Sequence, residues 1–385
     1  MISNRKTIGA IIRQLKVKNT EGQLGKDRLF GINIDKYFMP SVGNVIGADL
    51  TKYKIVHRDQ FACNRMHVGR DCRLPIALSR STDAFLVSPA YTVFEIIDSS
   101  EILPEYLFMW FSRTEFDREA WFHTDADVRG GLPWDLFCAI ELPVPSIEKQ
   151  RAIIEEYQTV TDRIKLNEQL NQKLEETAQA IYRHWFLDFE FPNEDGQPYK
   201  SSGGEMVYNE ELDQEIPEAW NVSQLRNIVK INYGKSLPAS RRINGHVKVY
   251  SSSGMTGSHN KELYFGASII IGRKGSIGTL YFEDGAVFCI DTAYYIRSED
   301  TELPLMFLFQ TLTQMNLPNM NEDSAVPGLN RDSLYDKFTI LPNDPILEKY
   351  SSFALDLNTY QKLLKEEGDL LRKNLGVVLS KMSRA

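Results

Sequence analysis

Residues 141–190 read ELPVPSIEKQRAIIEEYQTVTDRIKLNEQLNQKLEETAQAIYRHWFLDFE. Residues suited to a helix–helix seam recur here at alternating spacings of four and three over about four heptads, the pattern of a coiled coil. The predicted seam consists of Ile153, Tyr157, Val160, Ile164, Asn167, Asn171, Leu174, Ala178, Ile181 and Trp185. A helix of about forty residues is about 60 Å long. The stretch therefore predicts one long helix that requires a partner.

A second apolar pattern at the end of the chain supplies a candidate partner. Its predicted seam consists of Phe353, Leu357, Tyr360, Leu364, Gly368, Leu371, Leu375, Val378 and Met382. Two consecutive spacings of four around Leu364 predict a stutter that locally unwinds this helix. Asn167 and Asn171 would cost stability and could fix the register of an antiparallel pair. The alternative is two unrelated surface helices.

Landmarks before the two helices match each other, which indicates an internal repeat. Three matches carry it: Val68-Gly69-Arg70 with Ile271-Gly272-Arg273 at an offset of 203, Gly131-Leu132 with Gly328-Leu329 at 197, and Leu142-Pro143 with Leu341-Pro342 at 199. Short runs rich in β-forming residues precede predicted helices over 104–113 and 304–314. The chain is expected to hold two copies of one mixed domain, each followed by a long helix.

We therefore predict an α+β fold with two similar domains, each built on a mixed or antiparallel sheet with helices, and two long antiparallel coiled-coil helices between them. The predicted boundaries are domain 1 at 1–145, the first spacer helix at 146–190, an acidic linker at 191–219, domain 2 at 220–342 and the second spacer helix at 343–385.

The charge of each domain is divided along the sequence. Residues 1–82 hold 15 Lys and Arg against 6 Asp and Glu, and residues 220–275 hold 9 against 1, although the whole chain has a net charge of -8. A basic face on a globular domain is typical of proteins that bind a phosphate backbone. An ordinary solvated surface is the alternative, and the same polarity in both copies favours DNA binding.

The sequence gives no match to the common motifs of catalysis, metal binding or membrane insertion. The segment GRKGSIG, residues 272–278, matches neither a P-loop nor a dinucleotide fingerprint. The spacing of His57, Cys63, His67 and Cys72 matches no zinc template. No apolar run approaches the ~20 residues of a membrane span or resembles a signal peptide. We expect a cytoplasmic protein that binds no metal and has no catalytic centre of its own.

Three motifs in 141–190 occur in a known order. They are Leu142-Pro143-Val144-Pro145 with Glu148 and Gln150, then Leu166-Asn167 with Leu170-Asn171, and finally Trp185-Phe186 with Asp188-Phe189. In this order they resemble the central region of the specificity subunits of type I restriction-modification systems. NRMHVGR (64–70) and GRKGSIG (272–278) also look like signatures of the target recognition domains of that family. The second helix departs from the pattern, because it lacks the Gln of the opening motif and the Trp-Phe exit.

The resemblance implies a subunit without an active site. Each of two target recognition domains would read one half of a bipartite site in double-stranded DNA. The paired helices would act as a spacer and as a dock for two DNA adenine methyltransferase subunits. The resemblance also places S-adenosylmethionine and ATP on partner subunits, since a restriction subunit can join to form an ATP-dependent nuclease.

Arginine is the usual reader of guanine and asparagine of adenine, whereas cations on the backbone supply affinity. The predicted DNA-binding residues are Asn64, Arg65, His67, Arg70 and Arg73 in domain 1, and Arg241, Arg242, Arg273, Lys274 and Ser276 in domain 2. Arg70 and Arg273 could instead brace turns through carbonyl oxygens. A coiled-coil scaffold that binds only proteins is the alternative for the whole chain.

Overall fold

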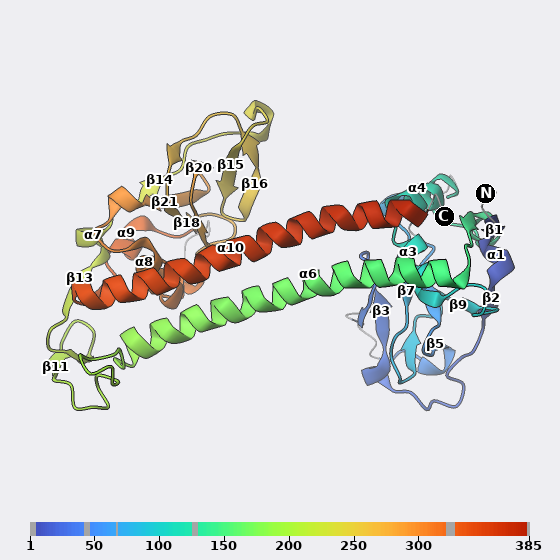
Figure 1. The fold of residues 1–385 in the computed structure, drawn as a ribbon, viewed down its shortest axis with the longest axis horizontal. Coiled ribbons are helices and arrows are strands. Elements are labelled where there is room, and N and C mark those ends of the chain that lie inside the picture. Colours follow the sequence, from blue (N-terminus) through green and yellow to red (C-terminus); the bar gives the residue numbers. More distant parts are fainter. Residues whose placement is uncertain (1–4, 42–46, 67, 125–129, 321–327, 383–385) are drawn as a thin grey trace. The chain divides into compact units, whose positions relative to one another are not determined.

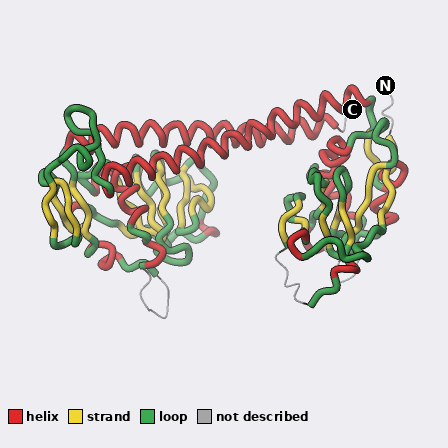
Figure 2. Tube along the Cα trace, turned by 90° about the horizontal axis from the view of Figure 1, so that it is seen from below, coloured by secondary structure: helices red, strands yellow, loops and turns green. Residues whose placement is uncertain are grey.

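The computed structural model describes residues 5–41, 47–66, 68–124, 130–320 and 328–382, so the predicted DNA-binding residue His67 lies outside the described residues. The chain divides into two compact units. Unit 1 comprises Met1–Asn167 with Glu366–Ala385, and unit 2 comprises Glu168–Lys365. Each unit therefore combines one of the two predicted domains with a part of each long helix. In Figure 2 the strands of each unit appear in yellow and its helices in red.

The sheet at the centre of unit 1 has four antiparallel strands. Their order is β2 (Ile12–Leu15), β9 (Thr92–Ile96), β6 (Phe61–Cys63) and β7 (Ile76–Leu78). Three further antiparallel pairs are β1 (Arg5–Thr7) with β10 (Glu141–Pro143), β3 (Phe30–Ile32) with β4 (Phe38–Pro40), and β5 (Lys54–Val56) with β8 (Phe85–Val87).

Short helices cover the sheet of unit 1. They are α1 (Ile8–Ile11), α2 (Val68–Asp71), α3 (Pro104–Phe111), α4 (Thr114–Phe122) and α5 (Trp134–Ala139), with single helical turns at Lys26–Arg28 and Leu50–Lys52. Phe61 of β6 stacks on Phe94 of β9 with ring centroids 5.1 Å apart, and the ring of Phe111 meets Phe61 edge-on at 5.8 Å. These aromatic rings join the sheet to α3 in one apolar core.

Unit 2 repeats this plan and adds a second sheet. The matching sheet has the order β14 (Asn232–Tyr233), β21 (Ala293–Arg297), β18 (Ser268–Gly272) and β19 (Leu280–Glu283). The added sheet has the order β16 (Gly254–His259), β15 (Val247–Ser251), β20 (Ala286–Cys289) and β17 (Tyr264–Phe265), and β15 and β20 are parallel. The α+β fold predicted from the sequence is thus confirmed, with mostly antiparallel and one mixed sheet.

The remaining elements of unit 2 follow the order of unit 1. Strand β13 (Asn221–Gln224) pairs with β22 (Phe338–Leu341), and the helices are α7 (Leu225–Ile228), α8 (Leu305–Gln314) and α9 (Arg331–Tyr335), with single turns at Ala239–Arg241, Ser298–Asp300 and Leu317–Asn319. Residues 191–219, predicted as an acidic linker, contain the hairpin of β11 (Met206–Asn209) and β12 (Gln214–Pro217). Phe191 and Ile216 belong to a buried cluster with Trp220.

Figure 1 shows the two long helices, α6 (Ile147–Tyr182) in green and α10 (Asp344–Lys381) in red. Helix α6 ends in a wider helical turn at Arg183–Leu187. In unit 1, Glu156 of α6 pairs with Lys381 and Arg163 pairs with Glu367. In unit 2, the ring of Tyr182 lies 5.9 Å from that of Tyr350. Residues further along α6 contact residues earlier in α10, so the two helices run antiparallel, as predicted.

The seam of α10 differs from the prediction. The inward-facing positions, buried or half-buried, are Leu347, Tyr350, Ala354, Leu357, Gln361, Leu364, Gly368, Leu371, Leu375, Val378 and Met382. Their spacings alternate between three and four throughout, so the predicted stutter is wrong. Phe353 and Tyr360 are 37% and 51% exposed, whereas Ala354 is 2% exposed. Apolar type alone selected Phe353 and Tyr360, but an exposed aromatic residue is common on protein surfaces.

Polar groups occupy part of the seam within unit 1. Asn167 is 2% exposed, and its amide Nδ2 donates to Glu367 Oε2 at 2.9 Å. Arg163 donates to both oxygens of the same carboxylate at 3.0 Å. These hydrogen bonds are satisfied in one helix register only, which supports the predicted role of Asn167 in fixing it.

Candidate nucleic-acid interface

The basic loop of unit 1 begins where strand β6 ends. The last ladder pair is Cys63 with Ile76, and Asn64 N then donates to Pro75 O at 2.8 Å. The carbonyl of Arg65 accepts a hydrogen bond from Leu132 N at 2.8 Å. Arg65, two residues after the end of β6, is therefore joined to the segment that precedes α5.

The side chain of Arg65 faces the protein. Its Nε donates to Thr92 Oγ1 at 3.1 Å, its Nη1 donates to the carbonyl of Leu132, and its guanidinium lies 5.6 Å from the ring of Trp134. Arginine at such a site joins three segments through its fork of donors and its flat face. These contacts make Arg65 a brace for the loop, and its predicted contact with DNA stays a prediction.

The basic loop of unit 2 begins in the same way after strand β18. The last ladder pair is Ile271 with Leu280, and Gly272 N then donates to Thr279 O at 2.8 Å. The carbonyl of Arg273 accepts from Leu329 N at 2.9 Å. Gly278, at φ 70, donates back to Gly272 O at 2.8 Å and closes a tight turn.

These hydrogen bonds decide which residues of the two units correspond. Asn64 takes the place of Gly272, and Arg65 takes the place of Arg273, with Leu132 and Leu329 as their matched partners. The sequence alignment of Arg70 with Arg273 is therefore wrong, whereas that of Gly131-Leu132 with Gly328-Leu329 is confirmed. Loops of different length separate the strands, so one offset cannot describe the whole repeat.

The guanidinium of Arg273 lies beside two aromatic rings that contact each other, with centroids 5.1 Å apart. It is 5.0 Å from the ring of Tyr233 and 5.6 Å from that of Tyr294, and its Nη1 donates to Asp291 O at 3.3 Å. Burial raises the pKa of Tyr294 to about 12, so this phenol is neutral at physiological pH. Arg273 therefore makes the carbonyl contact expected of a turn brace, while its half-buried side chain keeps part of its surface in water.

The other predicted residues of unit 1 lie on its surface. Arg70 is paired with Asp71, with Nε 2.7 Å from Oδ1, and this hydrogen bond raises the pKa of the already basic guanidinium. The side chain of Arg73 is 54% exposed and lies 3.4 Å from Asp35. Asn64 is half-buried, and its Oδ1 accepts from Met66 N at 3.2 Å in a local turn. Exposed pairs of this kind are weak and leave the arginines available to a phosphate.

The other predicted residues of unit 2 lie on two neighbouring turns. Lys274 and Ser276 are exposed in the turn after β18, and Arg241 is exposed in the turn at Ala239–Arg241. Arg242 is half-buried, and its Nη1 donates to Thr256 O of β16 at 2.8 Å. Arg242 therefore braces the edge of the added sheet.

The tip of the β15–β16 hairpin packs against the turn that follows β18. Ser252, between β15 and β16, has a carbonyl that accepts from Thr279 Oγ1 at 2.5 Å, and its N–H donates to Thr292 Oγ1 at 3.3 Å. The tip thus packs against the base of the turn that carries Lys274. The run Ser251-Ser252-Ser253 gave no chemical signal in the sequence, because serine is common in turns.

Metal binding finds no support in the geometry. Across the described ranges, no group of three or more His, Cys, Asp or Glu residues is placed to hold a metal ion. Cys63 is fully buried, and burial raises the pKa of its thiol to about 12. A thiol of that kind does not readily form the thiolate that a metal binds. Among the described helices, none is both long enough and apolar enough to cross a membrane.

Comparisons with known proteins agree on one family. Residues 217–350 match the family model described as the type I restriction modification DNA specificity domain. The type I restriction enzyme MjaIX specificity subunit of Methanocaldococcus jannaschii is 25% identical over 305 residues, which cover 72% of this chain and 67% of that protein. The HindI specificity subunit of Haemophilus influenzae is 33% identical over 112 residues, or 28% of this chain and 24% of that protein.

The fold agrees as well. A crystal structure of the type I restriction-modification system S subunit from M. genitalium superposes with a TM-score of 0.62 at 15% identity, covering 99% of this chain and 96% of that one. The chain is thus similar to type I restriction-modification specificity subunits in sequence, and it shares the fold of one of them over nearly its whole length.

The residues that match the family model lie within unit 2. Residues 217–350 contain β13 at their start, both sheets of unit 2 and the first turns of α10. Unit 1 repeats the same strand order around β6 and β9, and it repeats the loop connection to Leu132. The chain therefore contains two domains with a similar central sheet, and the family model matches the second of them.

Proposed function

We propose that this chain is a specificity subunit that directs a type I restriction-modification complex to a bipartite DNA site. Domain 1 reads one half-site and domain 2 the other, while the paired helices set the gap between the half-sites. The observation that supports this best is the repeat itself. Two domains of the same strand order each present a basic loop at the same point, after β6 and after β18, with one arginine anchored in the same way.

The chemistry of the complex is assigned to partners. The proposal places two methyltransferase subunits, which bind S-adenosylmethionine, on the helices, and a restriction subunit that uses ATP joins them where the system includes one. This chain contributes binding and position, as a subunit without catalytic residues. The helices offer a fixed geometry for that task, because Asn167, Arg163 and Glu367 hold their register. The proposed location is the cytoplasm.

The direct test is methylation mapping. The chain is co-expressed with a cognate methyltransferase subunit, and methylated adenines are mapped across host DNA by long-read sequencing. A split motif with a fixed gap is the expected result. Co-purification of the two proteins without any sequence-specific methylation would instead identify a protein scaffold.

The spacer role has its own test. One heptad is inserted after Asn171 and another after Gln361, two residues that contact each other in unit 2 through a hydrogen bond of 3.4 Å. Seven residues add about 10 Å to each helix, which corresponds to about three base pairs. The preferred gap should lengthen accordingly, and an insertion into α6 alone should abolish methylation. An unchanged gap in the double insertion would show that the helices do not set the spacing.

A further inference from the structure

A hollow of about 700 Å³ lies in unit 1, beside the basic loop that follows β6. Its walls come from the turn between β3 and β4, from residues 72–73 of the loop, and from α4. The lining residues that matter here are Lys36, Tyr37, Arg73, Asp117, Arg118 and Trp121. None of them except Arg73 was predicted to bind DNA.

A buried ion pair forms the floor of the hollow. Lys36 Nζ lies 2.8 Å from Asp117 Oδ1 and also donates to the carbonyl of Phe111. The same Oδ1 accepts from Leu74 N at 3.1 Å. Lys36 is 7% exposed and Asp117 is 8% exposed. One carboxylate thus joins the β3–β4 turn, α4 and the end of the basic loop, so the three walls are held in fixed positions.

The backbone of the turn is arranged to send Lys36 inward. Lys36 has a φ of 69, a left-handed conformation that lysine rarely adopts. Asn33 holds this turn, because its N–H donates to Tyr37 O at 2.9 Å, its Nδ2 donates to Tyr37 OH at 2.9 Å, and its Oδ1 accepts from Asp35 N at 2.7 Å. Strain of this kind persists where the surroundings over-determine it and often marks a functional site. Here it buries the lysine and leaves the ring of Tyr37 at the rim, 52% exposed.

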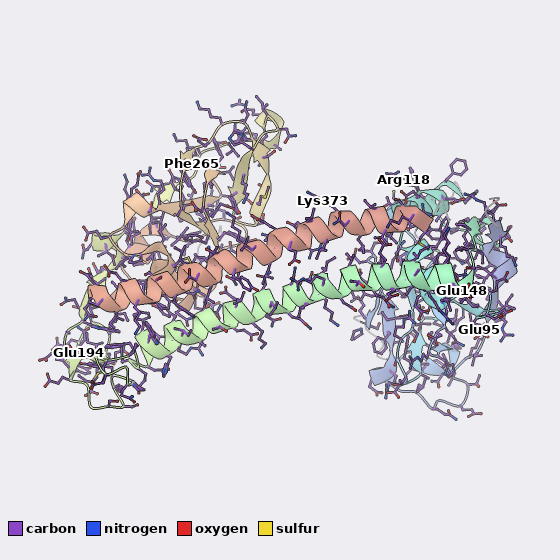
Figure 3. The ribbon with its side chains drawn as sticks, in the orientation of Figure 1. Glu95, Arg118, Glu148, Glu194, Phe265 and Lys373 are labelled. Carbon is purple, nitrogen blue, oxygen red and sulfur yellow. The ribbon has the colours of Figure 1, made fainter. Side chains whose placement is uncertain are left out.

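The rim combines cations with aromatic rings. Trp121 is 49% exposed, and its Nε1 donates to Gly69 O at 3.2 Å, which anchors the indole beside the basic loop. Arg118 lies on the same helix (Figure 3) and is exposed, and its guanidinium forms no ion pair or hydrogen bond with the residues that the structure describes. Exposed aromatic rings interleaved with arginines are suited to the sugars, bases and phosphates of nucleic acid.

The charged residues that line this hollow differ from those that line a second hollow in unit 1. Three cations line the first hollow against the two carboxylates of Asp35 and Asp117. The neighbouring hollow of about 410 Å³ is lined by two arginines and three glutamates. A phosphate backbone is attracted to the first and repelled from the second.

We infer that the hollow is a DNA-backbone site of domain 1, in which Arg118 and Arg73 meet phosphates and Trp121 packs against the adjacent nucleotide. This inference rests on the proposed function and adds α4 to the surface that binds DNA. Arg118 and Trp121 are its specific claims, because both lie outside the basic stretches of the sequence.

The first test measures the affinity of the complex with its methyltransferase subunit for a duplex that carries the mapped bipartite site, over a series of salt concentrations. The change Arg118→Ala should weaken binding and reduce the slope of log K against log salt by about one. Arg58→Ala is the matched control, since Arg58 is exposed in the same domain and does not line the hollow. An unchanged slope and affinity in Arg118→Ala would overturn the phosphate contact.

The second test separates stacking from loop positioning. Trp121→Ala should weaken binding by about 5- to 100-fold, whereas Phe122→Ala should have no effect, although Phe122 is 82% exposed next to it. Trp121→Phe keeps a ring but loses the N–H that reaches Gly69, so it should retain most of the affinity. If Trp121→Phe is as weak as Trp121→Ala, the residue acts through Gly69 and the packing claim is wrong.

The outcomes also distinguish this inference from the proposed function. If the wild-type complex fails to bind its duplex or to methylate a split site, the proposed function itself fails. If the wild type binds while Arg118→Ala and Trp121→Ala bind equally well, only the inference about the hollow fails. A duplex with the half-site of domain 1 scrambled completes the set: phosphate contacts should persist on it, so the Arg118→Ala slope difference should remain.

Discussion

The loops after β6 and after β18 share an anchor and differ in almost everything else. In both, the first arginine of the loop accepts a hydrogen bond through its carbonyl, from Leu132 in unit 1 and from Leu329 in unit 2. In unit 1 the side chain of that arginine reaches into the protein, whereas in unit 2 it lies beside the rings of Tyr233 and Tyr294. Both domains therefore share the hydrogen bond from a leucine N–H to the arginine carbonyl, whereas the exposed turns that follow differ.

The two loops also close differently. The loop of unit 1 is long, contains α2, and is fixed at its end by Asp117. The loop of unit 2 closes on itself through Gly272 and Gly278.

Removal of the Asp117 carboxylate should destabilise unit 1 most. Asp117→Ala leaves the buried Lys36 ammonium without its partner and Leu74 N without its acceptor, at a cost of about 3–5 kcal/mol. Urea denaturation measures the loss. The double change Lys36→Met with Asp117→Leu should be closer to the wild type, since no buried charge remains. A single variant as stable as the wild type would contradict the central role of this carboxylate.

Addition of one methyl group should distinguish the two strand ends. A Cβ at Gly272 would lie 2.1 Å from Ser276 O and 2.4 Å from Thr279 Oγ1, so Gly272→Ala should cost about 1–3 kcal/mol or more. The corresponding change in unit 1, Asn64→Ala, removes only a local hydrogen bond and should cost about 1 kcal/mol or less. Thermal unfolding of both variants provides the measurement. Equal losses would contradict the crowding at Gly272 that distinguishes the two strand ends.

The two matched arginines should separate stability from DNA binding. Arg65→Ala removes hydrogen bonds to Thr92 and Leu132 and should cost about 1–3 kcal/mol. Arg273→Ala removes one long hydrogen bond and should cost less, while weakening DNA binding in a salt-dependent way if Arg273 meets phosphate. Denaturation and binding are measured on the same preparations. Loss of stability without loss of binding in Arg273→Ala would leave it as a brace alone.

The smallest effect concerns the helix pair. Hydrogen bonds from Arg163 and then Asn167 hold the pKa of Glu367 below its usual 4.5, so its contribution to stability is present above that pH and is lost as the pH falls through the folded-state pKa. Glu367→Gln should therefore reduce the fall in Tm between about pH 6 and pH 3. In unit 2 the rings of Tyr182 and Tyr350 meet across the helix pair, and burial raises the pKa of the Tyr350 phenol, so Tyr350→Phe should leave the acid dependence unchanged. The same fall in Tm in the wild type and Glu367→Gln would exclude this carboxylate as its cause.

Local pattern accounts for what the sequence predicted correctly. The positions predicted for the seam of α6 are buried or half-buried, and α3 and α8 were placed close to their observed bounds. The paired landmark Gly131-Leu132 and Gly328-Leu329 also located the anchor that defines both domains. The resemblance of the opening motif has a structural reason in Gln150, which is fully buried and bonds to Glu101 O, Pro145 O and Leu103 N.

Periodicity and composition act over neighbouring residues, so they were sufficient to predict the two long helices, the repeat and the division of charge. The register of α10 depends instead on packing in the folded molecule, which buries Ala354 and leaves the larger Phe353 exposed. Tertiary contacts also establish that Arg65 corresponds to Arg273, and they bring Lys36 to Asp117 across 81 residues of chain. Such contacts depend on how loops of unequal length fold back, and no local pattern encodes that path.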